Sequence, residues 1–342
     1  MFFASDNTAG AHPKVLEGLT AANAEVLPAY GDDRYTSELQ ERLREIFDHE
    51  KLCAFPIATG SSGNALALAT LTPPWGAVYC HNQAHIHVDE CAAPEVANPG
   101  TKLITIAGQA GKLTGAAIAK AISGRDFVHA VQPATVSLTN LTEVGTAYSA
   151  EDLAALGSFC RSERLALHLD GARFANALVT SNASPAQMSW RAGVDALTFG
   201  ATKNGCLAAE VVVFFDPDKG EEFAFRRKRA GHLFSKMRFL SAQLLAYLQG
   251  DLWLETARHA NAMAAQLAQG LTAAGCPPYF PVGGNMIFAP IPEASQARLR
   301  AAGALFYPGR LPNTDGTDVR LVTAWSTTQA EVDRFLDVLS EG

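Results

Sequence analysis

A carboxylate and an amine each follow an apolar run of the chain. Asp170 ends the run 165–170 (LALHLD), and Lys203 follows the run 195–200 (DALTFG), 33 positions after Asp170. Apolar runs of this kind are typical of strands covered on both faces, and the carboxyl ends of such strands meet at one edge of a parallel sheet. A lysine amine can hold an aldehyde as an imine, and a carboxylate can keep a pyridine nitrogen protonated, as pyridoxal 5′-phosphate (PLP) requires. In an isolated pair of this kind, the aspartate more often caps a turn and the lysine is a solvated loop residue. The other motifs of the chain must therefore decide between this interpretation and a PLP site.

A second motif, Thr59-Gly60-Ser61-Ser62-Gly63-Asn64-Ala65, follows the apolar run 53–58 and begins a helical stretch. Amides and hydroxyls at a helix N-terminus form a seat for an anion, and the helix dipole favours it. An ordinary serine N-cap is the alternative. Because the chain also has Lys203, we interpret Gly60, Ser61 and Ser62 as the seat of the cofactor phosphate. We assign Thr202 to the same site.

Two arginines and a histidine are the candidates for handling a substrate. Arg173 lies three residues after Asp170, and Arg320 lies on a predicted strand near the C-terminus. A guanidinium forms two parallel hydrogen bonds with a carboxylate, which suits the α-carboxylate of an amino acid. His85 follows the run 77–81 at the same sheet edge, and a near-neutral imidazole could accept a proton. A structural histidine and surface arginines are the alternatives.

The order of these motifs resembles that of the L-threonine aldolases, which are PLP enzymes of fold type I. The similarity extends from Ser5-Asp6 to the C-terminal part and covers nearly the whole chain. The residues that carry it are Tyr30-Gly31-Asp32-Asp33, the 59–65 motif, His85 with Glu90, Asp170-Gly171-Ala172-Arg173, Lys203, and Val319-Arg320-Leu321-Val322-Thr323.

The resemblance implies further roles. His85 would stack on the PLP ring, and Glu90 would lie beside the cofactor, although a salt bridge or cap is the alternative for Glu90. Lys228 would contribute positive charge near the phosphate; the alternative for Lys228 is a position on a solvated helix face. Ser5 would donate to the substrate carboxylate, and Tyr30 would line the pocket from a neighbouring subunit. A homodimer or homotetramer is expected from the same resemblance.

The sequence departs from the family pattern at the residue that could serve as the catalytic base. Many threonine aldolases carry a second active-site histidine after the central strand, and here Thr142 stands near that position. The base that ionises the β-hydroxyl is therefore open, between His85 and a bound water. Aldolases that favour phenylserine-type substrates resemble this chain in lacking that histidine.

The expected reaction is cleavage of an L-β-hydroxy-α-amino acid of the threonine, allo-threonine or phenylserine type to glycine and an aldehyde. A PLP-dependent β-eliminating lyase or an amino-acid racemase would use the same Lys203 and Asp170, because fold does not settle function. A non-catalytic binding protein of this fold is the third interpretation, and the presence of both arginines beside this pair argues against it.

The elements that must position these residues alternate along the chain. Short apolar runs alternate with helical stretches up to about residue 245, which predicts an α/β fold with a mainly parallel seven-stranded sheet flanked by helices. The predicted strands are 53–58, 77–81, 102–107, 127–138, 165–170, 195–200 and 210–215. We expect a large PLP-binding domain over 1–245, including the N-terminal segment, and a smaller α+β domain over 246–342.

Composition excludes several classes of protein. The net charge of −7 disfavours nucleic acid as a partner, even with the basic run 226–229. The sequence has no apolar run of about 20 residues and no signal peptide, so neither a membrane span nor secretion is expected. Six scattered cysteines without zinc spacing predict reduced thiols, no metal site and a cytoplasmic protein.

Overall fold

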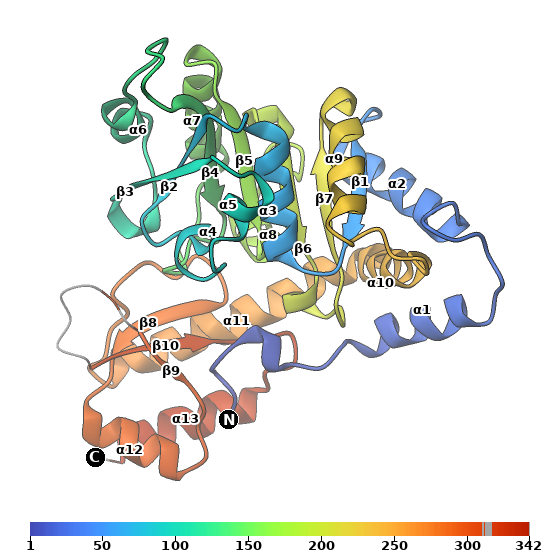
Figure 1. The fold of residues 1–342 in the computed structure, drawn as a ribbon. Coiled ribbons are helices and arrows are strands. Elements are labelled where there is room, and N and C mark those ends of the chain that lie inside the picture. Colours follow the sequence, from blue (N-terminus) through green and yellow to red (C-terminus); the bar gives the residue numbers. More distant parts are fainter. Residues whose placement is uncertain (310, 312–316, 342) are drawn as a thin grey trace.

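The computed structural model describes residues 1–309, 311 and 317–341, and its centre is a seven-stranded sheet (Figure 1). The strand order is β1-β7-β6-β5-β4-β2-β3. Strands β3, β2, β4, β5 and β6 are parallel neighbours, and β7 pairs antiparallel with β6 and with β1. The strands are β1 (Cys53–Ile57), β2 (Gly76–His81), β3 (Lys102–Ile106), β4 (Gln132–Thr139), β5 (Ala166–Gly171), β6 (Ala196–Gly200) and β7 (Glu210–Phe214). The predicted fold class is confirmed.

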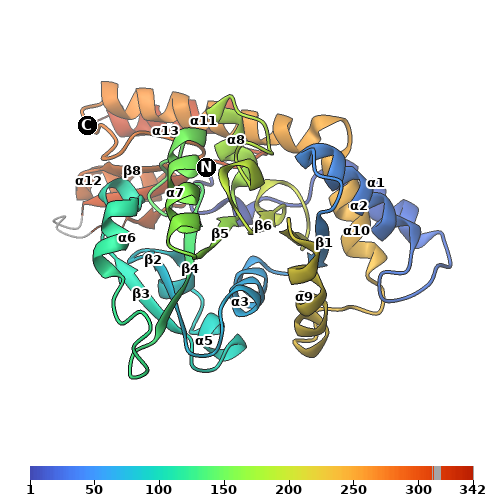
Figure 2. The same ribbon diagram turned by 90° about the horizontal axis from the view of Figure 1, so that it is seen from above.

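Helices cover both faces of this sheet. Figure 2 shows α3 (Gly60–Leu71), α5 (Ala93–Ala97) and α9 (Pro217–Arg229) together on one side, with α7 (Ala150–Ser162) and α8 (Phe174–Ser181) on the other. The remaining helices of this part are α1 (Pro13–Asn23), α2 (Arg34–Phe47), α4 (His85–Val88), α6 (Gly115–Ala121) and α10 (Arg238–Leu248), with short 3-10 turns at Asp6–Thr8, Gln109–Gly111, Trp190–Ala192, Thr202–Asn204 and Gln249–Asp251. None of the helices in the described part of the chain is both long enough and apolar enough to cross a membrane.

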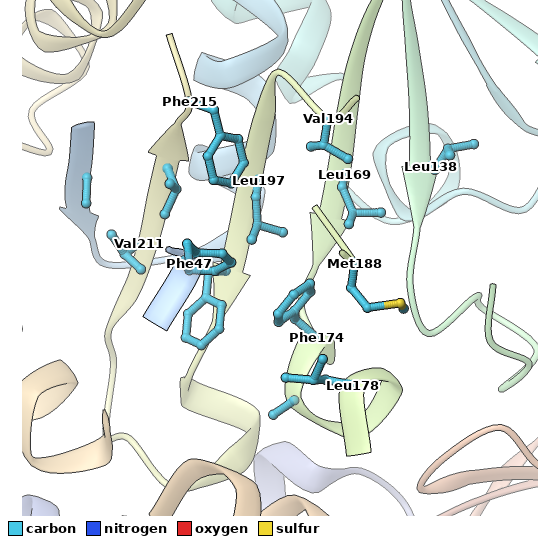
Figure 3. Packing of buried hydrophobic residues seen from close by; sticks show 14 of the residues in the cluster. Phe47, Leu138, Leu169, Phe174, Leu178, Met188, Val194, Leu197, Val211 and Phe215 are labelled. Atoms are coloured by element: carbon cyan, nitrogen blue, oxygen red, sulfur yellow. The ribbon is translucent and has the colours of Figure 1, made fainter. Parts of the chain in front are cut away.

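Alternate residues of the central strands enter different cores, as β7 shows. In β7, Val211 and Val213 pack in the large core that includes α2, α7 and α8, whereas Val212 and Phe214 pack against α3 and α9. Figure 3 shows the large core, in which Phe47 lies beside the strands. Because both faces are buried, the strands read as continuous apolar runs rather than as alternating ones.

A second core lies outside the main sheet. It is built on a three-stranded antiparallel sheet in the order β8-β10-β9, with Phe3 of the N-terminal segment fully buried in it. Its elements are α11 (Leu252–Ala273), β8 (Met286–Pro290), α12 (Glu293–Ala301), β9 (Tyr307–Pro308), β10 (Asp318–Val322) and α13 (Gln329–Ser340). A domain boundary near residue 245 stays a prediction.

One predicted strand begins too early. The run 127–138 was expected to be a strand throughout, but β4 starts only at Gln132. Phe127 and Val128 are exposed, and the Gln132 amide donates to the carbonyl oxygens of Gly124, Phe127 and Ala130, which folds 124–130 into turns. The segment before Gln132 was predicted as part of the strand because it is apolar, although it forms an exposed loop.

Candidate active site

A cavity of about 390 Å³ lies where the sheet, the N-terminus of α3 and the short helix α4 meet. Its two defining residues come from adjacent parallel strands: Asp170 lies near the end of β5, and Lys203 lies in the 3-10 turn after β6. The predicted site residues that line the cavity are Gly60, Ser61, His85, Glu90, Asp170, Arg173, Thr202 and Lys203.

Asp170 is directed toward α3 by the alternation of β5. Leu167 and Leu169 enter the large core, so Asp170 lies on the opposite face, where it is 3% exposed. The Asn64 amide of α3 donates to Asp170 Oδ2 at 2.9 Å, and the Ala172 amide donates to Oδ1 at 2.9 Å. These bonds hold a buried carboxylate in one orientation.

The Lys203 side chain is partly buried in the wall of the cavity. Burial, with the nearby Arg173 charge, lowers the pKa of Lys203, against the opposing charges of Asp6, Asp170 and Glu210. A lower pKa leaves more of the amine neutral, and only the neutral amine is a nucleophile. The adjacent Asn204 fixes the turn, since its amide donates to Tyr247 Oη at 2.7 Å and to the Trp253 carbonyl at 2.8 Å.

The N-terminus of α3 opens on the cavity. Thr59 is the N-cap, and its hydroxyl accepts from the Ser62 amide. The first amides of an α-helix have no carbonyl partner inside the helix, so those of Gly60 and Ser61 are suited to an anion. Ser62 does not line this cavity; its hydroxyl accepts from Thr59, and the residue lines a second hollow between α3, α5 and α9.

His85 is tied to two carboxylates. Its Nδ1 lies 2.8 Å from Glu90 Oε1, and its backbone amide donates to Glu143 Oε1 at 2.9 Å. The hydrogen bond to Glu90 raises the pKa of His85, against its partial burial. Glu90 in turn accepts from Asn64 at 2.9 Å, so Asn64 donates to both Glu90 and Asp170.

Arg173 carries a partner that the sequence analysis did not predict. Its Nε and Nη2 donate to Asp6 Oδ2 and Oδ1 at 2.7 and 2.9 Å, which forms a two-point ion pair with a buried carboxylate. Asn285 also donates to Asp6, at 3.0 Å. One edge of the guanidinium is therefore occupied by Asp6, and Nη1 donates no hydrogen bond within the described residues.

Besides Ser62, four predicted residues lie outside the cavity lining. Arg320 on β10 donates to the Ala4 carbonyl at 3.3 Å, and burial lowers its pKa to about 10, with the Arg173 charge adding to the effect. Ser5 caps the first 3-10 turn. Tyr30 is half exposed, and the Lys228 amine lies 4.7 Å from the centre of its ring, so these two contact each other at the surface.

The structure adds acidic and amide side chains to the cavity. Asn64, Glu143 and Glu210 line it, and Asp6 lies behind Arg173. Burial raises the pKa of Glu143 to about 7 and that of Glu210 to about 7. In the sequence, Asn64 belongs to the 59–65 motif and Glu143 lies in the stretch after the predicted strand 127–138; neither position alone indicates a role.

The donor set suits PLP. A buried lysine amine, a fixed carboxylate and a helix N-terminus face one cavity, and the buried atoms Asn64 Oδ1 and Glu90 Oε2 have no hydrogen-bond partner in the described part of the chain. Buried polar atoms without partners are rare and indicate a missing one. No group of three or more His, Cys, Asp or Glu in that part could hold a metal ion.

Comparisons with known proteins show the family of the chain. The profile of the β-eliminating lyase family matches residues 3–293. The chain is 42% identical to a low-specificity L-threonine aldolase of Pseudomonas aeruginosa over 89% of this chain and 88% of that protein. It is 39% identical to one of Pseudomonas sp. strain NCIMB 10558 over 96% of this chain and 94% of that protein.

Solved structures give the same result. A threonine aldolase of Leishmania major superposes with a TM-score of 0.93 at 30% identity, covering 99% of this chain and 98% of that chain. Aspartate aminotransferase of Thermus thermophilus, at 17% identity and a TM-score of 0.70 over 97% of this chain and 88% of that chain, shares the fold alone. The chain therefore belongs to the β-eliminating lyase family, among its threonine aldolases.

Proposed function

We propose that this protein is a PLP-dependent aldolase that cleaves an L-β-hydroxy-α-amino acid to glycine and an aldehyde. The observation that carries the proposal is the convergence of Lys203, Asp170 and Arg173 on one cavity at the carboxyl edge of the parallel strands. The names of the relatives support it, since they are low-specificity L-threonine aldolases.

In this proposal each residue has one task. Lys203 would hold the cofactor, Asp170 would face its ring nitrogen, and the amides of Gly60 and Ser61 would receive its phosphate. When bound, PLP would accept the electron pair left on Cα after the Cα–Cβ bond breaks. Arg173 would hold the substrate carboxylate with the donors that Asp6 leaves free, and would thereby orient the bond to be broken.

The first test is the replacement of Lys203. A Lys203→Ala protein is expected to lose stable attachment of PLP, seen as the loss of visible absorbance after dialysis, together with turnover. Lys120→Ala, an exposed lysine on α6, is the matched control and should keep both. Cofactor and turnover retained by Lys203→Ala would contradict the assignment.

The substrate is tested by offering L-threonine, L-allo-threonine and L-phenylserine to the protein with PLP. Equimolar glycine and aldehyde from any of them supports the aldolase, and the relative rates rank the substrates; a lead for phenylserine is expected. Ammonia and a keto acid would instead indicate β-elimination, which the family description also names.

Assembly and location are finer parts of the proposal. We expect a homodimer or homotetramer, with Tyr30 and Lys228 near the cavity of a neighbouring subunit, because in the single chain they lie at the surface away from its own. Sedimentation analysis tests this. All six cysteines are free thiols, which fits the reducing cytoplasm.

A further inference from the structure

The base for the β-hydroxyl can be sought among the side chains that the structure brings to the cavity. Thr142 is not one of them: it is fully buried, and its hydroxyl lies 2.8 Å from that of Thr146, which donates to the Ala110 carbonyl. The neighbouring Glu143 lines the cavity instead. The polypeptide thus places a carboxylate, rather than Thr142, in contact with this space.

Strand register brings the start of the loop that carries Glu143 next to Asp170. Thr139, the last residue of β4, pairs with Asp170 of β5, and the Asn140 amide donates to the Asp170 carbonyl at 2.9 Å. The loop that follows therefore starts at the cavity edge. Glu143 Oε1 accepts from the Thr139 hydroxyl at 2.8 Å and from the His85 amide at 2.9 Å.

These two bonds fix one carboxylate oxygen and leave the other available. Oε2 accepts no hydrogen bond within residues 1–309, 311 and 317–341, and it is not a fully buried orphan. A carboxylate that is anchored through one oxygen and open through the other is suited to exchange a proton with a bound molecule.

The other candidates are less suitable as proton acceptors. His85 Nδ1 lies 2.8 Å from Glu90 Oε1, so this ring nitrogen is already engaged by a carboxylate of the protein. Glu90 has no exposed side-chain surface. Glu210 lies on the Lys203 side, where its Oε2 accepts from the Ala201 amide at 2.7 Å.

We propose that Glu143 is the catalytic base that accepts the proton of the substrate β-hydroxyl. This inference rests on the proposed function. The hydroxyl proton passes to Oε2, and the O–H electron pair forms the carbonyl of the aldehyde. The Cα–Cβ pair stays on Cα, which takes a proton from water, while Glu143 returns its own to water. The sum converts substrate to glycine and aldehyde without an oxidant or reductant.

The surroundings of Glu143 match this use. The titratable groups that interact with it electrostatically are Asp170 of β5, Cys80 of β2 and Tyr148 of its own loop, and His85 of α4 contacts it through the backbone amide. Burial, opposed by hydrogen bonds from His85 and Thr139, raises its pKa to about 7. A group with a pKa near the working pH both accepts and releases a proton readily.

Glu143→Gln separates catalysis from structure, because the amide oxygen can still accept both bonds that Oε1 accepts. We expect kcat/KM for cleavage to fall about 100-fold or more, the usual contribution of a general base. Glycine has no β-hydroxyl, so the change in cofactor absorbance on adding glycine and the exchange of its α-proton in D₂O should stay at wild-type levels. Glu151→Gln, an exposed position on α7, is the matched control and should keep full activity.

The outcomes are distinct. Wild-type cleavage rates in Glu143→Gln would overturn the assignment, and so would a parallel loss of cleavage and of the glycine responses, since the residue would then act through the structure. If the wild type itself released no glycine and aldehyde, the proposed function would fail before Glu143 was tested.

Discussion

The ion pair between Asp6 and Arg173 fixes the orientation of the guanidinium in the folded chain itself. Asp6 is 2% exposed and accepts two hydrogen bonds from the guanidinium. Side-chain entropy is thereby lost during folding rather than during binding, which favours tight recognition of a carboxylate. The carboxylate of Asp6 occupies one edge of the guanidinium, so in the proposed function substrate and Asp6 would share Arg173.

Replacement of Asp6 tests the value of this pair. We expect Asp6→Asn to lower the free energy of unfolding at pH 7 by about 3 kcal/mol, because it leaves a mostly buried arginine without its counter-charge. Substrate KM should rise as well. Urea unfolding and steady-state kinetics measure the two effects, and Asp32→Asn, an exposed aspartate, should change neither.

The loss of stability in Asp6→Asn should depend on pH. Burial alone would raise the pKa of Asp6, but the charges of Arg173 and Lys203 and the hydrogen bonds outweigh it, so the folded-state pKa lies below 3.8. The stabilisation is therefore present above pH 3.8 and is lost as pH falls further through the folded-state pKa. The stability gap between wild type and Asp6→Asn should narrow in that range; a constant gap would show that the charge is not its source.

At the scale of elements, the two-residue period of β5 explains why its leucines enter the large core while its polar side chains lie on the side of the cavity. Leu167 and Leu169 enter the large core, while His168 and Asp170 face the α3 side. His168 is fully buried; its Nδ1 lies 2.9 Å from Ser137 Oγ of β4, and its Nε2 lies 3.1 Å from Thr198 Oγ1 of β6. A neutral imidazole thus bridges three strands just below the cavity.

His168 should make this sheet sensitive to acid. Burial lowers its pKa to about 4, whereas the unfolded chain titrates near 6.5. Between these values the unfolded state binds more protons, so stability falls as pH falls, by about 3 kcal/mol over the whole window at 1.36 kcal/mol per pKa unit. Urea unfolding between pH 7 and 4.5 measures it. His168→Gln should flatten this slope, and the exposed His129→Gln should not.

How well the sequence predicted each helix or strand depended on the burial and the length of that element. Strands buried on both faces, such as β6 and β7, are continuous apolar runs, and their predicted bounds agree with the structure to within a residue. The start of β4 was placed wrongly because Phe127 and Val128 are apolar yet exposed. Short helices such as α4 and α5 span about one turn and leave too little periodicity to recognise.

The candidate site was predictable where a residue follows directly from its strand. Asp170 lies near the end of β5 and Lys203 lies just after the neighbouring strand β6, so their meeting follows from the order of elements. Asn64, Glu143 and Asp6 could not be assigned in this way, because their contacts join segments far apart in the chain: α3 with β5, a loop with α4, and the N-terminus with α8. Those contacts depend on packing that no local pattern encodes.

At the scale of the whole molecule, the N-terminal segment connects the second core to the cavity. Phe3 is fully buried in that core, and its ring lies 5.2 Å from that of Phe335, edge to face. Its amide donates to the Leu305 carbonyl and its carbonyl accepts from the Val322 amide, each at 2.8 Å. The next residues reach Arg320 through the Ala4 carbonyl and Arg173 through Asp6.

This path predicts that a change in the second core weakens substrate binding. Phe3→Ala should lower the free energy of unfolding by roughly 3 to 5 kcal/mol, as for other buried phenylalanines. It should also raise KM more than it lowers kcat, because Asp6 and Arg173 lose their fixed placement while Lys203 keeps its own. Phe2→Ala is the matched control, since Phe2 is 56% exposed and should leave both quantities near wild type. If Phe3→Ala lost stability but kept the wild-type KM, the N-terminal segment would be an anchor for the second core alone, and the placement of Arg173 would depend on α8.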